Sequence, residues 1–415
     1  MAENWEISQS AFGPGRLPFL QAECIAESAE WSGLPEEAIS FLQKAAAEIR
    51  TNPDLIRLSW HCHHTLFIGK SCSRSDTREW PLLTDLIGDH AGAFYLLIAL
   101  SGVPLLRAEH KSRGIPDDIS RDTCSDTTIW ARQYASIGVE RNGRFYHPGQ
   151  PEAWGLDTRI FPWILSHLYG DLYRVGRLQY KIGPFRQRLR TYRHNRTRHL
   201  CMLAESGQEF RADGCYNGSG GISEEKGAWI SELEESDTKA TGFPINPEGR
   251  ASRKKRSLNL SEWKGILQQD DPILEIHIPE DGSMDFDACG ESLRRLIQFF
   301  PEHFPDRPFK GICCTSWLLD PAYQNLLSDR SNIVRFQREC FLFPLNSRGG
   351  RAGLERIFYE YAHDLSTAPR DTSMRRAVLD HLDAGGVLVS GGALIFPEHL
   401  EWGTQPYLQM PWTHG

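Results

Sequence analysis

Two ionisable side chains lie two positions apart in the otherwise apolar segment LEIHIP, residues 274–279. Side chains alternate between the two faces of a strand, so Glu275 and His277 would share one face while their apolar neighbours take the other. A carboxylate beside an imidazole is a pair that can take up protons. Burying both groups costs free energy unless they are paired or solvated. The segment therefore predicts either a cleft lined by this pair or an edge strand whose polar face meets water.

The loop after this strand is acidic. Its sequence, EDGSMDFD, leads into a helix predicted from apolar residues at three- and four-residue spacing between Phe286 and Phe300, with Asp285 as the N-cap. A strand, a tight loop and a helix can together hold an anion on backbone N–H groups. The carboxylates of this loop would instead satisfy the helix N-terminus and repel a pyrophosphate. Residue chemistry alone therefore does not predict a phosphate site here.

A second candidate site lies at the end of the predicted strand in ICCTSWLLDP, residues 312–321. Ser316, Trp317 and Asp320 come where a strand ends, which is the usual place for a binding site in an open α/β sheet. Asp320 could instead only cap the helix predicted in DPAYQNLL. Tyr323 follows in the first turn of that helix, either as a proton donor or as a packed aromatic.

Two further predicted strands carry polar rows. In SNIVRFQRE, Arg335 and Gln337 share a face by alternation, and in GRLQYKI the same holds for Arg177, Gln179 and Lys181. Such rows either line a substrate groove, where an arginine can fix a carboxylate or phosphate, or form a solvated sheet face.

The chain also contains a basic stretch and a histidine-rich motif. The arginine-rich stretch at residues 185–199 could contact RNA, CoA phosphates or an acidic partner, or form a solvated, charged strand pair. The motif HCHH at residues 61–64 has no second well-spaced pair of ligands after it, and none of the ten cysteines forms a CxxC pair. We expect no metal site and no disulfide framework.

Composition limits the classes of protein that remain. The chain has 415 residues, 40% of them hydrophobic, with a net charge of −8 and a pI near 6.0. It is long enough for two packed cores and is no polycation. The N-terminus lacks the pattern of a secretory signal, and the apolar run AGAFYLLIALSGVPLL is broken by Gly102 and Pro104. We expect a cytoplasmic protein that does not act at a membrane.

The predicted secondary structure of the chain changes near residue 176. Residues 1–175 read mainly as helices, and residues 176–415 read as strands alternating with helices. Residues 213–259 are polar and glycine-rich and are expected to form a loop or a partly ordered insertion. The predicted fold is α+β: a helical N-terminal domain followed by a mixed α/β domain with a central, mainly antiparallel sheet.

Five segments in the second half of the chain, in this order, resemble those of a known family: GRLQYKI, ILEIHIPEDG, CCTSWLLDP, SNIVRFQRE and PRDTSMRRAVLDHLDAGG. They resemble bacterial acyltransferase-domain proteins that join an N-acyltransferase N-terminal domain to a GNAT-like C-terminal domain. The resemblance implies acetyl-CoA or another acyl-CoA as donor, and a small-molecule or peptide amine as acceptor.

The resemblance also implies roles for residues. Glu275 or His277 would be the general base and Tyr323 the acid, and loop residues Ile278, Gly282 and Ser283 would lie along the CoA. The remaining polar candidates would bind the substrate: Arg177, Gln179, Ser316, Trp317, Asp320, Arg335 and Gln337. No glycine-rich RGxGxG-like turn follows Pro279.

Two alternatives follow from that missing turn and from the arginine-rich stretch. One is a catalytically degenerate GNAT-like module that binds a peptide, RNA or small ligand. The other is an acyltransferase whose donor is a carrier protein or an aminoacyl-tRNA.

Overall fold

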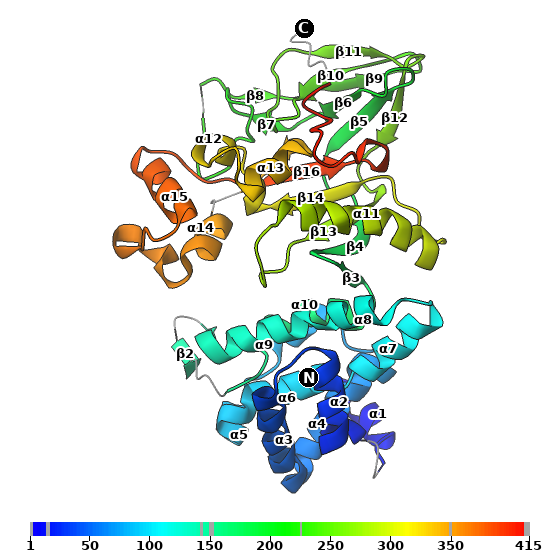
Figure 1. The fold of residues 1–415 in the computed structure, drawn as a ribbon, viewed down its shortest axis with the longest axis vertical. Coiled ribbons are helices and arrows are strands. Elements are labelled where there is room, and N and C mark those ends of the chain that lie inside the picture. Colours follow the sequence, from blue (N-terminus) through cyan, green and yellow to red (C-terminus); the bar gives the residue numbers. More distant parts are fainter. Residues whose placement is uncertain are drawn as a thin grey trace. The chain divides into compact units, whose positions relative to one another are not determined.

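The computed structural model describes residues 3–13, 17–141, 144–148, 153–224, 226–347 and 351–410. The chain divides into two compact units (Figure 1). The first comprises residues 1–179 together with the loop 279–283, and the second comprises residues 180–278 and 284–415.

The first unit is a helical assembly built around one fully apolar helix. Every residue of α6 (Ala91–Leu100) is buried, and this helix contacts α2, α3, α4 and α10. The stretch Thr84–Ser112 is long and apolar enough to cross a membrane by length and composition, but 78% of its most apolar window is buried inside the protein, as in a core helix. The other main helices are α1 (Trp5–Ser10), α2 (Ala22–Trp31), α3 (Glu36–Thr51), α4 (Pro53–His63), α5 (Thr84–Ile87), α7 (Val103–Ser112), α8 (Asp117–Cys124), α9 (Asp126–Ile137) and α10 (Phe161–Leu168).

Strands β1 and β2 form a small antiparallel ladder after α9, and β3 follows α10. Strand β1 spans Gly138–Arg141, β2 spans Arg144–Pro148 and β3 spans Leu172–Val175. Gly138 on β1 pairs with Pro148 on β2.

One six-stranded sheet carries the candidate residues Gln179, Glu275, His277 and Ser316. Its strand order is β15-β16-β14-β13-β4-β3. The ladder between β13 and β14 is parallel, whereas β16 pairs antiparallel with both β14 and β15. The bounds of the remaining strands are β4 (Leu178–Pro184), β13 (Pro272–His277), β14 (Ile312–Ser316), β15 (Phe341–Pro344) and β16 (Gly391–Ile395).

A second six-stranded sheet is antiparallel, with order β11-β10-β6-β5-β12 and β9 attached to β10. Its strands are β5 (Leu189–His194), β6 (Leu200–Ala204), β9 (Leu233–Glu235), β10 (Lys239–Ile245), β11 (Arg256–Asn259) and β12 (Trp263–Leu267). Strands β7 (Glu209–Phe210) and β8 (Trp229–Ile230) form a separate pair. The α+β class with mainly antiparallel sheets is confirmed.

The prediction of a loop at residues 213–259 is wrong where four short strands form within that segment. It contains β8, β9, β10 and β11, and it buries Ala240, Ile245 and Leu258. Its polar and glycine-rich composition hid short strands, whose few apolar residues suffice because neighbouring strands supply the rest of the core.

The two sheets of the second unit share one apolar core, which includes Leu189 and Met202 from one sheet and Ile273, Phe341 and Leu394 from the other. Helix α11 (Phe286–His303) runs beside β13 and β14 (Figure 1). A separate helical cluster is formed by α12 (Tyr323–Leu326), α14 (Arg351–Phe358) and α15 (Ser373–Asp383).

The strand predicted in SNIVRFQRE is wrong. Residues Asn332–Arg338 form the helix α13, which contacts α11, α12 and β15. Val334 and Phe336 are both buried because several elements enclose this short helix. Burial at two-residue spacing therefore imitated a strand pattern.

Candidate functional site

Strands β13 and β14 separate at the position of the candidate pair. Their parallel register runs from Leu274–Ile312 to Ile276–Cys314 and ends there. Strand β14 continues for two more residues, but only along β16, where Thr315 pairs with Gly392. His277 therefore lies on the part of β13 that has left its parallel neighbour. An opening between two parallel strands leaves backbone groups and side chains available to a ligand.

Glu275 and His277 lie together at this opening. Glu275 Oε2 is 3.9 Å from His277 Nε2, and the two side chains are 32% and 35% exposed. Neither is sealed in the core, in contrast to Ile273 on the same face, which is 1% exposed. The face thus changes from core to solvent along β13, which brings two proton-accepting groups to the point where the strands part.

The neighbouring cysteine is unsuited to nucleophilic attack. Cys313 pairs with Glu275 in the ladder and is 5% exposed. Burial, with smaller contributions from Cys314 and Glu275, raises the pKa of the Cys313 thiol well above its usual value. The thiol stays protonated at neutral pH, so a thiolate nucleophile is disfavoured.

Strand β4 continues the same polar face. The Tyr180 hydroxyl is 2.8 Å from Ser292 Oγ on α11, so Tyr180 faces the helix. By alternation, Lys181 and Gly183 take the opposite face, and Gly183 indeed lies directly against the Glu275 carboxylate.

Arg177 binds the backbone of the loop that follows β13. Arg177 donates from Nη2 to the Pro279 carbonyl at 2.8 Å and to the Gly282 carbonyl at 2.5 Å, and from Nε to the Ser283 carbonyl at 2.7 Å. Its side chain is only 9% exposed. Arg177 was predicted to bind substrate, whereas the structure shows it bound to the backbone of this loop.

The acidic side chains of the loop are also engaged. Arg174 donates to Asp281 Oδ2 at 2.6 Å, and Gln133 donates to Glu280 Oε2 at 2.9 Å. Asp285 accepts from the Ala288 N–H at 2.9 Å, as predicted for the N-cap. These contacts reduce the repulsion that the sequence suggested between the loop and an anion.

The loop keeps backbone donors available. Within the part of the chain that the structure describes, the N–H groups of Asp281, Gly282 and Ser283 have no hydrogen-bond acceptor. A Cβ added at Gly282 would meet no atom within 4 Å, so the loop is open on that side. Of the predicted cofactor residues, Gly282 and Ser283 are exposed and Ile278 is half-buried.

Gln179 belongs to a buried network in the first unit. Its amide donates to Asp126 Oδ1 at 2.7 Å, and Trp130 Nε1 and Trp163 Nε1 donate to Oδ2 at 3.0 Å and 2.5 Å. Burial lowers the pKa of His167, whose Nε2 is 3.6 Å from the same carboxylate. Gln179 is 1% exposed. These contacts make Gln179 a structural residue in this state and leave no surface for substrate.

The candidate residues at the end of β14 cap helical turns or pack in an apolar cluster. Ser316 Oγ accepts from the Leu318 N–H at 3.1 Å. Asp320 is 1% exposed and accepts from the Ala322 and Val389 N–H groups at 2.9 Å and 2.8 Å, which matches the capping alternative. Trp317 and Tyr323 pack in the helical cluster around α12, α14 and α15.

The side chain of Tyr323 is buried, and burial raises the pKa of its hydroxyl further above its ordinary value. The role of Tyr323 as the acid remains a prediction. The structure places its hydroxyl in an apolar core.

Arg335 and Gln337 do not share a strand face, because α13 is a helix. The Arg335 guanidinium lies 3.7 Å from the centre of the Phe286 ring. Gln337 is 1% exposed and donates to the Leu318 and Asp320 carbonyls at 2.8 Å and 3.0 Å. Both side chains support neighbouring segments, so the prediction that they line a substrate groove loses its geometric basis.

The arginine-rich stretch forms ion pairs along β5. Arg190 donates to Glu235, Arg188 lies 3.9 Å from Glu205, and Arg193 donates to Glu398. This arrangement matches the solvated, charged alternative.

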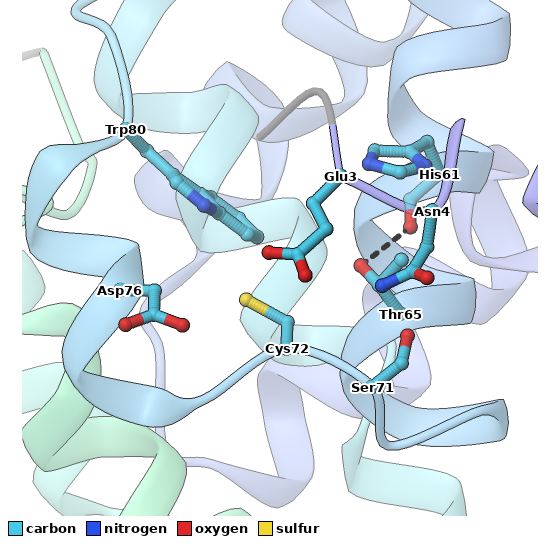
Figure 2. Close-up of a pocket in the computed structure, with 8 residues that line it drawn as sticks. All are labelled: Glu3, Asn4, His61, Thr65, Ser71, Cys72, Asp76 and Trp80. Atoms are coloured by element: carbon cyan, nitrogen blue, oxygen red, sulfur yellow. Dashed lines mark hydrogen bonds between the residues drawn. The ribbon is translucent and has the colours of Figure 1, made fainter.

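The HCHH segment lies beside a small cavity of about 30 Å³ in the first unit. Figure 2 shows Glu3, Cys72 and Asp76 pointing into this space. Burial, with Asp76 and Glu3, raises the pKa of Cys72. His61 and His63 instead contact the hydroxyls of Ser8 and Ser101. In the described ranges no three His, Cys, Asp or Glu side chains gather as metal ligands.

Sequence reasoning missed the supporting residues of the site. Arg174 was not singled out, although it binds Asp281, and Gly183 was not singled out, although it lies against Glu275. The glycine inside an alternating strand pattern was the one available signal, since such a glycine often marks a close approach.

The fold and this site define the protein as a GNAT-like acyltransferase of two domains. Residues 24–145 match the N-acyltransferase N-terminal domain, and residues 172–395 match the GNAT-like C-terminal domain. The second match covers more than half of the 415 residues, so the chain belongs to the family with a GNAT-like C-terminal domain. A search of curated proteins gave no match.

Solved acyltransferases share the fold over almost the whole chain. One, in complex with decanoyl-CoA and teicoplanin, is 22% identical with a TM-score of 0.58, covering 95% of each chain. Another, in complex with CoA and 10C-teicoplanin, is 22% identical with a TM-score of 0.58, covering 94% of this chain and 93% of the other. A mutant acyltransferase with octanoyl-CoA is 21% identical with a TM-score of 0.58 and the same coverage.

Proposed function

We propose that this N-acyltransferase moves a medium-chain acyl group from CoA to an amine on a glycopeptide-like acceptor. The observation that carries the proposal is the Glu275–His277 pair, 3.9 Å apart and about one third exposed, where β13 parts from β14. The choice of ligands follows proteins of the same fold, which bind octanoyl-CoA, decanoyl-CoA and teicoplanin. It replaces the expectation of acetyl-CoA with a longer acyl chain.

The reaction needs one base near the acceptor. Glu275 or His277, directly or through a water molecule, takes a proton from the ammonium, and the freed nitrogen lone pair attacks the thioester carbonyl carbon. As the carbon–nitrogen bond forms and the carbon–sulfur bond breaks, the nitrogen loses a second proton and the leaving thiolate takes up one. The products are an amide, the free thiol of CoA and one proton released to solvent.

The loop 279–283 supplies the means of holding the donor. Its N–H groups at Asp281, Gly282 and Ser283 are available, and its nearby carboxylates are bound by Arg174 and Gln133. Oriented N–H groups in such a loop favour an anion such as the CoA pyrophosphate. Arg177 acts here by shaping the loop through its carbonyl groups.

A degenerate binding module remains the competing function, because no glycine-rich turn follows Pro279. Isothermal titration with decanoyl-CoA and with decanoyl-pantetheine, which lacks the pyrophosphate, separates the two. We expect decanoyl-CoA to bind at least tenfold more tightly. Absence of binding to any acyl-CoA would contradict the acyltransferase mechanism and favour the module.

Turnover is tested with octanoyl- or decanoyl-CoA and teicoplanin-type glycopeptides that carry a free amine. Thiol release should depend on the acceptor, and mass spectrometry should find one acyl group added to it. Glu275→Gln and His277→Ala should both reduce the rate, whereas Glu302→Gln, an exposed carboxylate on α11, should not. Unchanged rates in both site variants would refute the assignment of the base.

A further inference from the structure

Strand β4 contains a glycine that its backbone does not require. Gly183 is not among the residues with positive φ, so any L-amino acid could adopt its conformation. A glycine inside a strand weakens that strand, because it has no side chain to pack and loses more entropy on folding. Its presence therefore calls for a steric reason.

The steric reason is the carboxylate of Glu275. A Cβ atom placed on Gly183 would lie 2.8 Å from Glu275 Oε1, 3.1 Å from its Cδ and 3.6 Å from its Oε2. All three atoms of the carboxylate thus rest on the space that a side chain at position 183 would occupy. Gly265 on β12 differs, because the nearest atom to a Cβ placed there would belong to Tyr192, at 3.8 Å.

We propose that Gly183 is a positioning residue for acyl transfer: by lacking a side chain, it leaves the space that holds the Glu275 carboxylate beside His277. The inference rests on the proposed function, in which Glu275 belongs to the proton-accepting pair. Gly183 touches neither substrate nor reacting atoms and acts only through Glu275.

The carboxylate is the far end of a flexible side chain, so a methyl group at position 183 would displace it rather than the strand. Glu275 would then turn to another rotamer and move relative to its partner 3.9 Å away. Displacing a base by about 1 Å can reduce a rate by about 10²-fold, while the donor loop stays in place.

The test is Gly183→Ala, with Gly265→Ala as the matched strand-glycine control. With decanoyl-CoA and an amine-bearing teicoplanin-type glycopeptide, we expect kcat to fall 10- to 100-fold in Gly183→Ala and its pH profile to change. The KM for decanoyl-CoA should stay within twofold, and the control should retain both constants. A merely structural defect would instead lower the fraction of active enzyme without changing the pH profile.

A double-mutant cycle shows whether Gly183 acts through Glu275. Adding Gly183→Ala to Glu275→Gln should reduce kcat by less than twofold beyond the single Glu275→Gln variant. A crystal structure of Gly183→Ala should show the carboxylate displaced from His277. Wild-type kcat in Gly183→Ala, with an impaired Glu275→Gln, would overturn this inference alone. Full activity in Glu275→Gln would instead contradict the role of Glu275 in the proposed function.

The proposal stays testable if Gly183→Ala fails to fold. Removing the clashing side chain as well, in Gly183→Ala/Glu275→Ala, should then restore folding as judged by circular dichroism and thermal unfolding. If the double variant also fails to fold, the glycine is needed for another reason and the proposal is wrong.

Discussion

Two carboxylates in this protein have opposite surroundings. Asp126 is 2% exposed, and the N–H groups of Trp130, Trp163 and Gln179 all donate to it. The side chain of Glu275 is 32% exposed, and its carboxylate lies 3.9 Å from the His277 imidazole. Among the residues that the structure describes, none donates a hydrogen bond to the Glu275 carboxylate.

Asp126 serves the stability of the fold, whereas Glu275 is available for chemistry. A buried carboxylate whose oxygens are occupied stabilises the elements that supply its donors, and it has no oxygen left for a proton or a substrate. A half-exposed carboxylate with unoccupied oxygens contributes little to stability and can take up a proton. Replacing each should therefore affect a different property of the protein.

The largest effect is expected at the exposed carboxylate. Glu275→Gln should lower kcat/KM by about 10³-fold, because amide nitrogen and oxygen cannot act as a base, and this corresponds to about 4 kcal/mol. The melting temperature should change by less than that of a typical core variant. Steady-state thiol release and calorimetry measure the two quantities, with Glu302→Gln as the control. If Glu275→Gln is destabilised but active, Glu275 has a structural role and not a chemical one.

The buried carboxylate should show the opposite result. Asp126→Ala leaves the indole N–H groups of Trp130 and Trp163 without their acceptor, so unfolding free energy should fall by about 3 kcal/mol. Urea unfolding measures the loss, and Asp85→Ala, at an exposed position on α5, is the control. Equal stability of both variants would show that the network around Asp126 does not support the first unit.

The first unit should also lose stability in acid. Burial lowers the pKa of His110 from its usual 6.5 to about 4. Because the unfolded chain takes up this proton first, the free energy of unfolding should fall between pH 6.5 and pH 4, by at most about 3 kcal/mol. His110→Gln should flatten this slope, whereas the exposed His363→Gln should not. A slope that His110→Gln leaves unchanged would assign the acid sensitivity to other groups.

A smaller effect is expected where an arginine shapes the donor loop. Arg177→Ala removes the hydrogen bonds to three loop carbonyls, so the KM for decanoyl-CoA should rise about tenfold, or about 1.4 kcal/mol, with a smaller change in kcat. Arg294→Ala, at an exposed position on α11, is the control. A fall in kcat at constant KM would instead place Arg177 closer to the chemistry than its contacts indicate.

The smallest effect is expected at Arg188, which directly precedes β5. Arg188 and Glu205 are 50% and 20% exposed, with 3.9 Å between their charged atoms. Exposed ion pairs contribute less than about 1 kcal/mol, so Arg188→Ala should leave stability and turnover nearly unchanged. Reduced binding of a carrier protein or tRNA by this variant would revive the basic stretch as a docking surface.

Much of the architecture could be predicted from periodicity. The helical first half, the strands β4, β13 and β14 and the helix α11 with its Asp285 cap all follow from spacing and capping residues. Prediction failed at α13 and within residues 213–259, where short elements take their burial from neighbours rather than from their own pattern.

The candidate site was only partly accessible in the same way. Glu275 and His277 stand out as polar residues in an apolar strand, and the structure does bring them together. Gln337 and Asp320 looked equally polar, yet each is buried against backbone groups. A polar residue type does not reveal whether its partner is a protein group or a ligand.

By itself, the sequence determined which side chains share a face wherever the type of element was predicted correctly, because that follows from the geometry of consecutive residues. It thereby defined the pair on β13 and the cap of α11. Only the tertiary structure decided that β13 and β14 part beside that pair, that Gly183 makes room for Glu275, and that Arg174 and Arg177 bind the acidic loop. The contacts of Gly183, Arg174 and Arg177 join residues about 90 or more positions apart, and such pairings depend on how the whole chain packs rather than on any local pattern.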